Sequence, residues 1–518
     1  MPPSRRWVFL LIALTVLIRL PSLLAPEALD DEAIYSVVAI EMVHGGQPYI
    51  SAVERKPPLL FWTYAAVLGT FGTTNWPGLH LVSLLWVLST MAGLYVIARR
   101  LFDPTTGLVA ALLYSIYQPY LTWKNLAFNG ELMMNLPIVL AALLVFRPSK
   151  SPRRPELLAA GALLCAAFLL KQPAAAAAVP LGIYLLLPGY RRARGLAPID
   201  SVTQATLLTV GFLGALGLVV LVLAKQGILG EAIYWAITDH DVPHGPLDPV
   251  FWYLAQGSLV TFVLACAPLV LGAVISVRAR DADGPRYWRG LRPEFTTLLI
   301  LVAASVIGVS ASGRFYPHYF IQLVPPLVLL AAPVYARLWA RTDLAQQGWT
   351  SPAHLSRAWL ALTVVVFLIS YVRGVPRLGS SEAGNYIQEH SNPEDRIFVW
   401  GQYTALYLYA HRRPASRYIA TFPLTGYIFG SPLSWDPRHD TSDRILPGAW
   451  TTLERELTAR PPLYIVDRDA LLPVAKHPIA RFPFLNQLVT THYRLVRRAA
   501  DGLIYRRIED VSPALPPN

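Results

Sequence analysis

Runs of apolar residues long enough to cross a bilayer recur along most of this chain. Of its 518 residues, 54% are hydrophobic and 15% are charged, whereas soluble globular proteins usually carry about 25% charged residues. The sequence therefore predicts an α-helical polytopic membrane protein. The first apolar run follows Arg5 and Arg6 and could be a signal peptide, but it lacks a clear small-x-small cleavage site. We interpret it as a retained first helix.

The formal net charge of +12 does not indicate a nucleic-acid partner. The arginines cluster in short loops between apolar runs, which is how membrane proteins encode their topology. No basic stripe with interleaved aromatic residues is present, so we exclude nucleic acid binding. The two cysteines, Cys165 and Cys266, lie inside apolar runs and indicate neither a metal site nor a disulfide.

Placing the amino terminus and the arginine-rich loops in the cytoplasm predicts about eleven transmembrane helices. Nine single spans are expected near residues 7–24, 78–98, 107–121, 132–146, 206–224, 251–277, 295–310, 319–338 and 360–372. The apolar stretch 157–187 would form a helix of about 46 Å, longer than the roughly 30 Å bilayer core. We expect it to form two short spans that meet at Lys171, because this keeps the basic loops on either side of it inside.

The stretch "LLFWTYAAVLGTFG" (59–72) is a competing span, but it is short and typical of an interfacial helix. Counting it as a span would move every later basic cluster outside. The chain after residue 373 is more polar: "RIFVWG", "PPLYIVD" and "DGLIYRR" predict strands, and "TTLERELTA" and "FPFLNQLVTTHY" predict helices. We therefore expect a membrane domain over 1–373, with exterior loop 1 at 25–77, and a small exterior α/β domain over 374–518.

This topology brings the unusual polar residues to one face of the membrane. They are Asp30, Asp31, Glu32 and Lys56 in loop 1, Glu131 and Lys171 at span ends, Asp239, His240, Asp241 and His244 after the seventh span, and Arg314, His318 and Tyr319 between the ninth and tenth. Ionisable residues at membrane depth indicate function by default. Simpler roles stay open: Asp30 as a solvated acid, Lys171 as a snorkelling side chain, and His240 with His244 as zinc ligands or plain hydrogen-bonding residues.

A carboxylate and several cations at an outer membrane face suit the transfer of a sugar from a lipid phosphate. Nearby cations stabilise the leaving phosphate, each by about 4 kcal/mol before desolvation. A carboxylate takes the proton from the acceptor hydroxyl, and a single in-line displacement inverts the anomeric centre. A hydrolase with two carboxylates is the alternative chemistry, but no acid partner is obvious.

Several motifs resemble the GT-C membrane glycosyltransferases, in particular the family 39 protein O-mannosyltransferases and the bacterial lipid A aminoarabinose transferases. The motifs are "DDEAIYSVVAIEM", "GGQPY", "ERKPPLLFW", "GELMMN", "FLLKQP" and "HYFIQLVPP". The resemblance implies a GT-C fold, a polyprenyl-phosphate sugar as donor, and a site on the periplasmic side of a bacterial cytoplasmic membrane.

The resemblance also implies roles for individual residues. Asp31 is the expected catalytic base, with Glu32 and Tyr35 beside it and Glu131 as the second loop acid. The donor phosphate is expected to contact Lys56, Lys171 and Tyr319, to which we add Arg314, His318 and, near the substrate, His240.

Two departures from the family limit what can be carried over. Related aminoarabinose transferases tend to have an acid directly before the K-P-P lysine, where this chain has Arg55, so no metal or other cofactor is indicated. The lumenal insert of the eukaryotic mannosyltransferases is missing, so the acceptor (protein, lipid or glycan) and the sugar stay open. The alternative function is a transporter, which would favour midplane charges and an internal repeat; a non-catalytic scaffold would not need charges clustered on one side.

Overall fold

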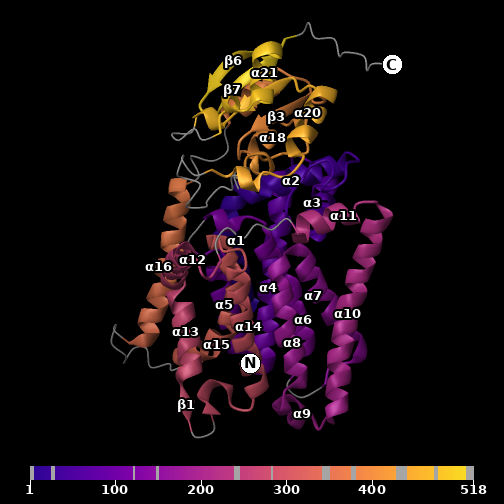
Figure 1. The fold of residues 1–518 in the computed structure, drawn as a ribbon. Helices are drawn as coiled ribbons and strands as arrows, with labels where there is room; N and C mark the ends of the chain where they lie inside the picture. The colour runs from indigo at the N-terminus through magenta and orange to yellow at the C-terminus, as the bar shows by residue number, and fades with distance from the viewer. Residues whose placement is uncertain are drawn as a thin grey trace.

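The structure is a computed structural model that describes residues 5–24, 30–120, 123–147, 151–238, 245–281, 284–340, 351–374, 381–426, 440–471 and 477–508. Long helices form a bundle, and a small α/β region caps one end of it (Figure 1). The predicted fold class, a helical membrane protein with a small carboxy-terminal α/β region, is confirmed.

Helices occur at every predicted span. The bundle helices are α1 (Arg5–Leu24), α4 (Trp76–Leu101), α5 (Pro104–Tyr117), α6 (Gly130–Val145), α7 (Arg154–Leu170), α8 (Ala175–Leu186), α10 (Pro198–Lys225), α12 (Pro249–Ala265), α13 (Ala267–Arg278), α14 (Arg292–Ser310), α15 (Val324–Ala340) and α16 (Pro352–Gly374). Among the described residues, six helices are long and apolar enough to cross a membrane, or up to eight if each bent pair forms one span. The count of eleven spans stays a prediction, because α5 and α6 have only 14 and 16 residues.

The structure confirms the break at Lys171 and corrects the span expected at 251–277. After α7 ends, the single turn η3 (Gln172–Ala174) leads into α8. The segment expected as one span forms α12 and α13, which meet at an angle of 90°. Pro268 stands in the first turn of α13 and has no amide hydrogen to continue the helix from α12, so the bend has a local cause.

Two further helices lie in loop 1, α2 (Asp30–Val43) and α3 (Pro58–Phe71). Both lie at the end of the bundle that faces the α/β region (Figure 1). The short elements between the bundle helices are η2 (Trp123–Leu126), α9 (Pro188–Arg194), α11 (Leu229–Ile233), the π-helical turn η4 (Tyr234–Thr238), β1 (Arg280–Asp281), β2 (Gly284–Pro285), η5 (Arg286–Trp288) and η6 (Pro317–Leu323).

In the described part of the carboxy-terminal region, five strands form one sheet in the order β4-β3-β5-β7-β6. They are β3 (Arg396–Trp400), β4 (Arg413–Pro414), β5 (Tyr464–Asp467), β6 (Tyr493–Ala499) and β7 (Gly502–Arg507). β3 runs parallel to β4 and β5, and β7 is antiparallel to both β5 and β6. The helices and turns are α17 (Glu382–Glu389), α18 (Ala405–Tyr409), α19 (Phe422–Thr425), η9 (Ser442–Arg444), α20 (Ala449–Ala459), η10 (Asp469–Leu471), η11 (Ile479–Arg481) and α21 (Pro483–His492). All five predicted elements of this region are present.

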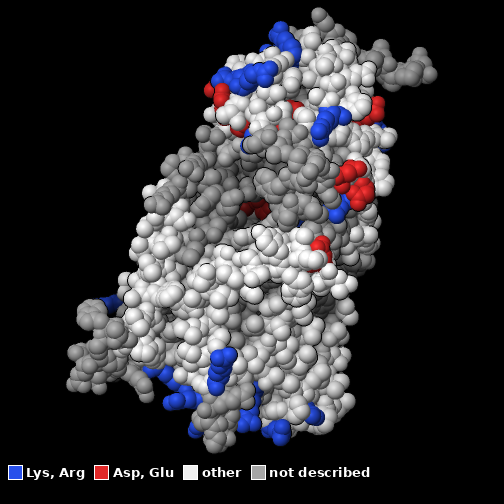
Figure 2. Space-filling view, turned by 60° about the vertical axis from the view of Figure 1, so that its left-hand side comes forward, with Lys and Arg blue, Asp and Glu red and all other residues white. Residues whose placement is uncertain are grey.

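The charges of the bundle are distributed unevenly between its two ends. Figure 2 shows Lys and Arg side chains gathered at the end away from the sheet. The last turns of α4, α9, α13 and α15 contain basic residues, namely Arg99, Arg100, Arg191, Arg192, Arg194, Arg278 and Arg337. The sheet and loop 1 therefore share the end opposite the basic one.

Candidate active site

Asp31 lies in the first turn of α2, so the DDE sequence begins a helix within loop 1. The amino terminus of a helix favours a negative charge. Tyr35 stands one turn further along the same face, and its hydroxyl donates a hydrogen bond of 3.3 Å to Asp31 Oδ2. The Asp31 side chain is 34% exposed. The helix thus presents an oriented carboxylate that a substrate can still reach.

Glu131 and Lys171 form a buried ion pair at the break between α7 and α8. Lys171 Nζ lies 2.8 Å from Glu131 Oε1, and the two side chains are 8% and 2% exposed. Glu131 stands in the first turn of α6, which Asn129 caps by accepting from the Leu132 amide at 3.0 Å. A Cβ on Gly130 would lie 3.0 Å from Lys171 Cδ. Glycine therefore lets the start of α6 approach Lys171 closely.

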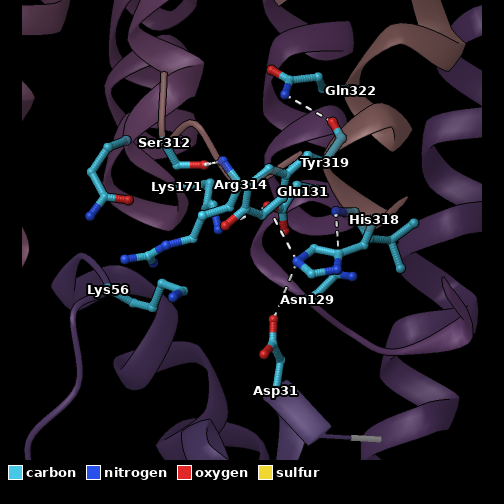
Figure 3. Close-up of polar contacts among 12 residues, drawn as sticks. Asp31, Lys56, Asn129, Glu131, Lys171, Ser312, Arg314, His318, Tyr319 and Gln322 are labelled. Carbon is cyan, nitrogen blue, oxygen red and sulfur yellow. Dashed lines mark hydrogen bonds and ion pairs between the residues drawn. The ribbon is translucent and has the colours of Figure 1, made fainter. Parts of the chain in front are cut away.

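The turn η6 connects this ion pair to Asp31. His318 Nε2 lies 3.5 Å from Asp31 Oδ2 and 4.0 Å from Glu131 Oε1 (Figure 3). The Lys171 ammonium lies over the Tyr319 ring, and its nitrogen is 5.0 Å from the ring centroid. The turn thus brings His318 to both carboxylates and Tyr319 to the Lys171 ammonium.

Lys56 enters the site from the extended segment before α3. Its carbonyl accepts a 2.7 Å hydrogen bond from the buried Tyr49 hydroxyl, and its ammonium lies 5.8 Å from the Tyr35 ring centroid. Lys56 Nζ also lies 3.3 Å from Glu54 Oε1, in a pair exposed by 18% and 9%. Glu54 was not among the predicted site residues. The aminoarabinose transferases tend to have an acid at the position of Arg55, and in this chain an acid stands one residue earlier, at Glu54.

Arg314 completes the cationic side of the site. Its side chain extends toward Lys56, and both lie on the same side of the cluster as Lys171 (Figure 3). Its backbone amide donates to Ser312 Oγ at 3.3 Å. The next residue, Phe315, is buried and has a φ of 51°, an unfavourable value for a non-glycine residue. Such local strain is common where a backbone is held in place at a functional site.

The positive groups around Asp31 keep it ionised. Burial opposes the charge, but His318, Lys56 and Lys171, together with the Tyr35 hydrogen bond, lower the pKa of Asp31 below its ordinary value. A general base must be deprotonated at working pH, and this environment provides that state.

Glu32, predicted as catalytic beside Asp31, is directed away from this cluster. It is 4% exposed and accepts a hydrogen bond from the Phe128 backbone amide. Its other oxygen lies 3.5 Å from His80 Nε2. Burial raises the pKa of Glu32 to about 8, although the Phe128 bond and the Arg19 charge oppose this rise. Its contacts are those of a residue that anchors α2.

Arg19 and His80, which the sequence analysis did not single out, belong to this anchoring network. Arg19 is fully buried and donates to Ser83 Oγ at 2.7 Å, Leu126 O at 2.6 Å and Gln118 Oε1 at 3.0 Å. An arginine in the middle of the first apolar run was the available signal, since such a residue is costly without partners.

One predicted site residue cannot be placed: His240, with Asp239, Asp241 and His244, lies outside the described residues. Within the parts of the chain that the structure describes, no three His, Cys, Asp or Glu side chains are grouped as a metal site would require.

A small apolar pocket lies within the bundle, next to the turns η3 and η6. It is lined mainly by aliphatic side chains of α4, α6, α8, α14 and α15. Pro173, two residues after Lys171, and Gln322, which donates to the Tyr319 carbonyl, also line it. The turns next to Lys171 and Tyr319 therefore also border an apolar pocket.

Comparisons with known proteins identify the fold. Residues 55–216 match the family model of dolichyl-phosphate-mannose-protein mannosyltransferases. The structure is similar to ArnT from Cupriavidus metallidurans, in the apo state and bound to undecaprenyl phosphate, with TM-scores of 0.59 and 0.60, 17% identity, and coverage of 98% of this chain and 98% and 99% of ArnT.

It is also similar to the Archaeoglobus fulgidus oligosaccharyltransferase in complex with an inhibitory peptide and a dolichol-phosphate, with a TM-score of 0.51, 13% identity, and coverage of 99% and 75% of the two chains. A sequence search of curated proteins found no match. The resemblance predicted from the sequence is confirmed, and the chain has the GT-C fold.

Proposed function

Because the chain has the GT-C fold, we propose that it is an inverting glycosyltransferase. It transfers a sugar from a polyprenyl-phosphate donor to an acceptor hydroxyl. The observation that carries this proposal is the open charge cluster, in which the ionised and partly exposed Asp31 faces Lys56, Lys171 and Arg314. A phosphate leaving group needs cations, and an acceptor hydroxyl needs a base on the other side of the reacting carbon.

In the proposed reaction the acceptor oxygen attacks the anomeric carbon while the bond from that carbon to the phosphate oxygen breaks. The bonding electrons pass to the polyprenyl phosphate, whose growing charge Lys171, Lys56 and Arg314 stabilise. Asp31 receives the proton of the acceptor hydroxyl. Tyr35 and His318, which contact the Asp31 carboxylate, orient it. One displacement inverts the anomeric centre.

Two observations support a lipid-linked donor. An apolar pocket lies near Lys171, since Pro173 lines it, and it places hydrocarbon side chains close to the cations that would meet the phosphate. One of the similar structures, ArnT, is bound to undecaprenyl phosphate. We further propose a location in the bacterial cytoplasmic membrane with the site on the outer face, since loop 1 and the sheet lie opposite the basic end of the bundle.

The test is to incubate the purified protein with radiolabelled polyprenyl-phosphate sugars and a delipidated cell-envelope fraction as acceptor. We expect label to leave the lipid and enter the acceptor fraction, and the Asp31→Asn variant not to support this transfer. Donors that stay intact in every combination would contradict the proposal. Intact labelled donor that crosses the bilayer of a proteoliposome would instead indicate the transporter.

A further inference from the structure

Loop 1 is fastened to the carboxy-terminal region at three separate points. Glu41 pairs with Arg413 through two hydrogen bonds of 2.6 and 3.0 Å. The Val53 amide donates to the Arg417 carbonyl at 3.0 Å. The Arg55 guanidinium lies 4.3 Å above the Phe422 ring centroid. Segment 413–422 therefore runs along the part of loop 1 that lies between Asp31 and Lys56 in the sequence. Asp31 and Lys56 are both predicted site residues.

The contact at Glu41 joins the carboxy-terminal region to α2. Glu41 stands in the last turn of α2 and its side chain is 4% exposed. Its charge faces Arg413 and also Arg396, 3.6 Å away. Planar two-point pairing of a carboxylate with an arginine fixes orientation as well as distance. A buried carboxylate without its arginine is strongly unfavourable, so this pair holds the helix that carries Asp31 in one position.

The Arg55 contact acts at the other end of the segment. The Arg55 carbonyl accepts a 3.0 Å hydrogen bond from Gln172 Nε2, and the same nitrogen donates to the Ala236 carbonyl at 2.9 Å. Gln172 follows Lys171, and Arg55 precedes Lys56. Arg55 thus lies between Phe422 on one side and the Lys171 segment on the other, and its position sets the spacing of the two lysines.

We propose that the carboxy-terminal region is a positioning element of the active site. Through Glu41 and Arg55 it fixes the carboxylate helix and Lys56 relative to Lys171. None of these linking residues contacts substrate in the proposed reaction; they act through their neighbours in the chain. The inference rests on the proposed function for its activity readout and extends it, because it assigns a role to Arg55, where this chain departs from its relatives.

An interface that only stabilises the fold would contain the same contacts, so the test must separate position from stability. The variants are Arg55→Gln and Phe422→Leu at one contact, and Glu41→Gln and Arg413→Gln at the other. The matched control is Glu382→Gln, which removes a 2.8 Å ion pair to Arg497 within the carboxy-terminal region and away from loop 1. Phe422→Tyr keeps the aromatic face and serves as the conservative variant.

We expect each of the four variants to lower kcat/KM about 10- to 100-fold at a temperature where the protein stays folded, because small misplacements of reacting groups have effects of this size. At the Arg55–Phe422 contact the two changes should cost no more together than singly, since both remove the same interaction. At the Glu41 contact they should cost less than the sum of the single changes, since Glu41 also faces Arg396. Phe422→Tyr and Glu382→Gln should keep wild-type turnover. Hydrogen exchange in peptides covering 41–56 should rise in the four variants and not in the control.

Hydrogen exchange judges the positioning inference without reference to turnover, so a failure of the proposed function would not obscure it. If wild-type protein transfers no sugar but exchange at 41–56 rises as expected, the coupling stands and the proposed function fails. Unchanged exchange and unchanged turnover in all four variants would overturn the inference. Lower thermal stability with unchanged turnover would also overturn it, because that is the result expected of a purely stabilising interface.

Discussion

The two ends of the helical bundle each contain a buried ion pair, and the two pairs differ in what surrounds them. At the basic end, Arg194 lies 3.6 Å from Glu294, and both side chains are 3% exposed. Glu294 accepts from the Tyr184 hydroxyl at 2.6 Å, and Arg194 donates to the same hydroxyl at 3.0 Å and to the Arg147 carbonyl. The Tyr190 ring stacks on the guanidinium at 4.1 Å. This pair is closed on all sides by protein.

At the end near the sheet, the Lys171–Glu131 pair is equally buried, but its neighbours are not. His318, Lys56 and Asp31 are 22%, 18% and 34% exposed. The Arg194–Glu294 pair, called the inner pair below, joins four parts of the chain: α8, α9, α14 and the segment that follows α6. Protein side chains surround it and leave no room for a ligand. The Lys171–Glu131 pair, called the outer pair below, forms one cluster with His318, Lys56 and Asp31. This outer cluster leaves one side of its charges accessible to a ligand. The two pairs are both buried and differ in the exposure of their neighbours, which is why we propose a binding role for the cluster near the sheet and a structural role for the other pair.

The largest effect on turnover is expected at Asp31, in the cluster near the sheet. Asp31→Asn keeps the shape and the Tyr35 contact but loses the base, and general base catalysis contributes about 10²- to 10⁴-fold. Turnover should fall to near background while donor binding survives. Because the pKa of Asp31 lies below its ordinary value, protonation of the base should not limit activity between about pH 5 and 8.

Product formation and donor affinity, measured for Asp31→Asn and for Asp30→Asn, check this prediction. Asp30→Asn should be far milder. If only Asp30→Asn were inactive, the base would move by one residue. Two fully active variants would remove this chemistry.

At the inner pair we expect a large effect on stability and none on chemistry. Removing one partner of a buried ion pair typically lowers the free energy of unfolding by about 3–5 kcal/mol. Glu294→Ala should therefore unfold at lower temperature, while the protein that remains folded keeps wild-type kcat. Thermal unfolding and single-turnover kinetics on the same sample separate the two quantities. A kcat that fell with stability unchanged would break the comparison.

Lys171 tests the outer pair in the same way. Its removal leaves Glu131 buried without this partner, so stability should fall here too, but the kcat of the protein that remains folded should fall as well. Lys171→Met keeps the unbranched aliphatic shape, one atom shorter, but removes the cation that stabilises the leaving phosphate in the proposed reaction. Losing one such stabilising group costs about 10²- to 10³-fold in kcat. Lys56→Met should have a smaller effect, because Lys56 is more exposed and water screens its charge. Steady-state kinetics and donor binding check both variants, and wild-type kinetics in both would contradict the assignment to the phosphate.

The parts of the fold that the sequence predicts well depend on local patterns. Apolar runs located every bundle helix, and the interruption "LLKQP" located the break at Lys171. The bend at Cys266 was missed although Pro268 marked it, because the apolar composition continues through it. Acids followed by an apolar stretch predict a helix start, and this signal in "DDEAIYSVV" was interpreted as a loop.

Contacts between distant segments could not be predicted. Glu41 and Arg413 are 372 residues apart, and nothing near either residue indicates the other. Glu32 stands directly beside Asp31 in the sequence, so the motif suggested a shared role. On a helix, neighbouring residues point about 100° apart. That geometry separates the exposed Asp31 from the buried Glu32, whose partners Arg19, His80 and Phe128 come from other segments.

The smallest expected effect concerns Glu32, which lies near the outer cluster but is closed like the inner pair. Its pKa is raised to about 8, above the ordinary 4.5, because burial penalises the carboxylate. Below about pH 4.5 the group is protonated in both the folded and the unfolded chain. As the pH rises from there to 8, Glu32 ionises only in the unfolded chain, so the folded state loses stability through this window.

Glu32→Gln removes this pH dependence and still offers Phe128 an acceptor. The variant should therefore have a free energy of unfolding about 1–3 kcal/mol above that of wild type at pH 8 and equal to it at pH 4.5. Turnover should stay within about tenfold of wild type, well above that of a missing base. Thermal unfolding at the two pH values and kcat at pH 7 provide the check. A Glu32→Gln variant as inactive as Asp31→Asn would show that Glu32 acts in catalysis together with the open cluster around Asp31.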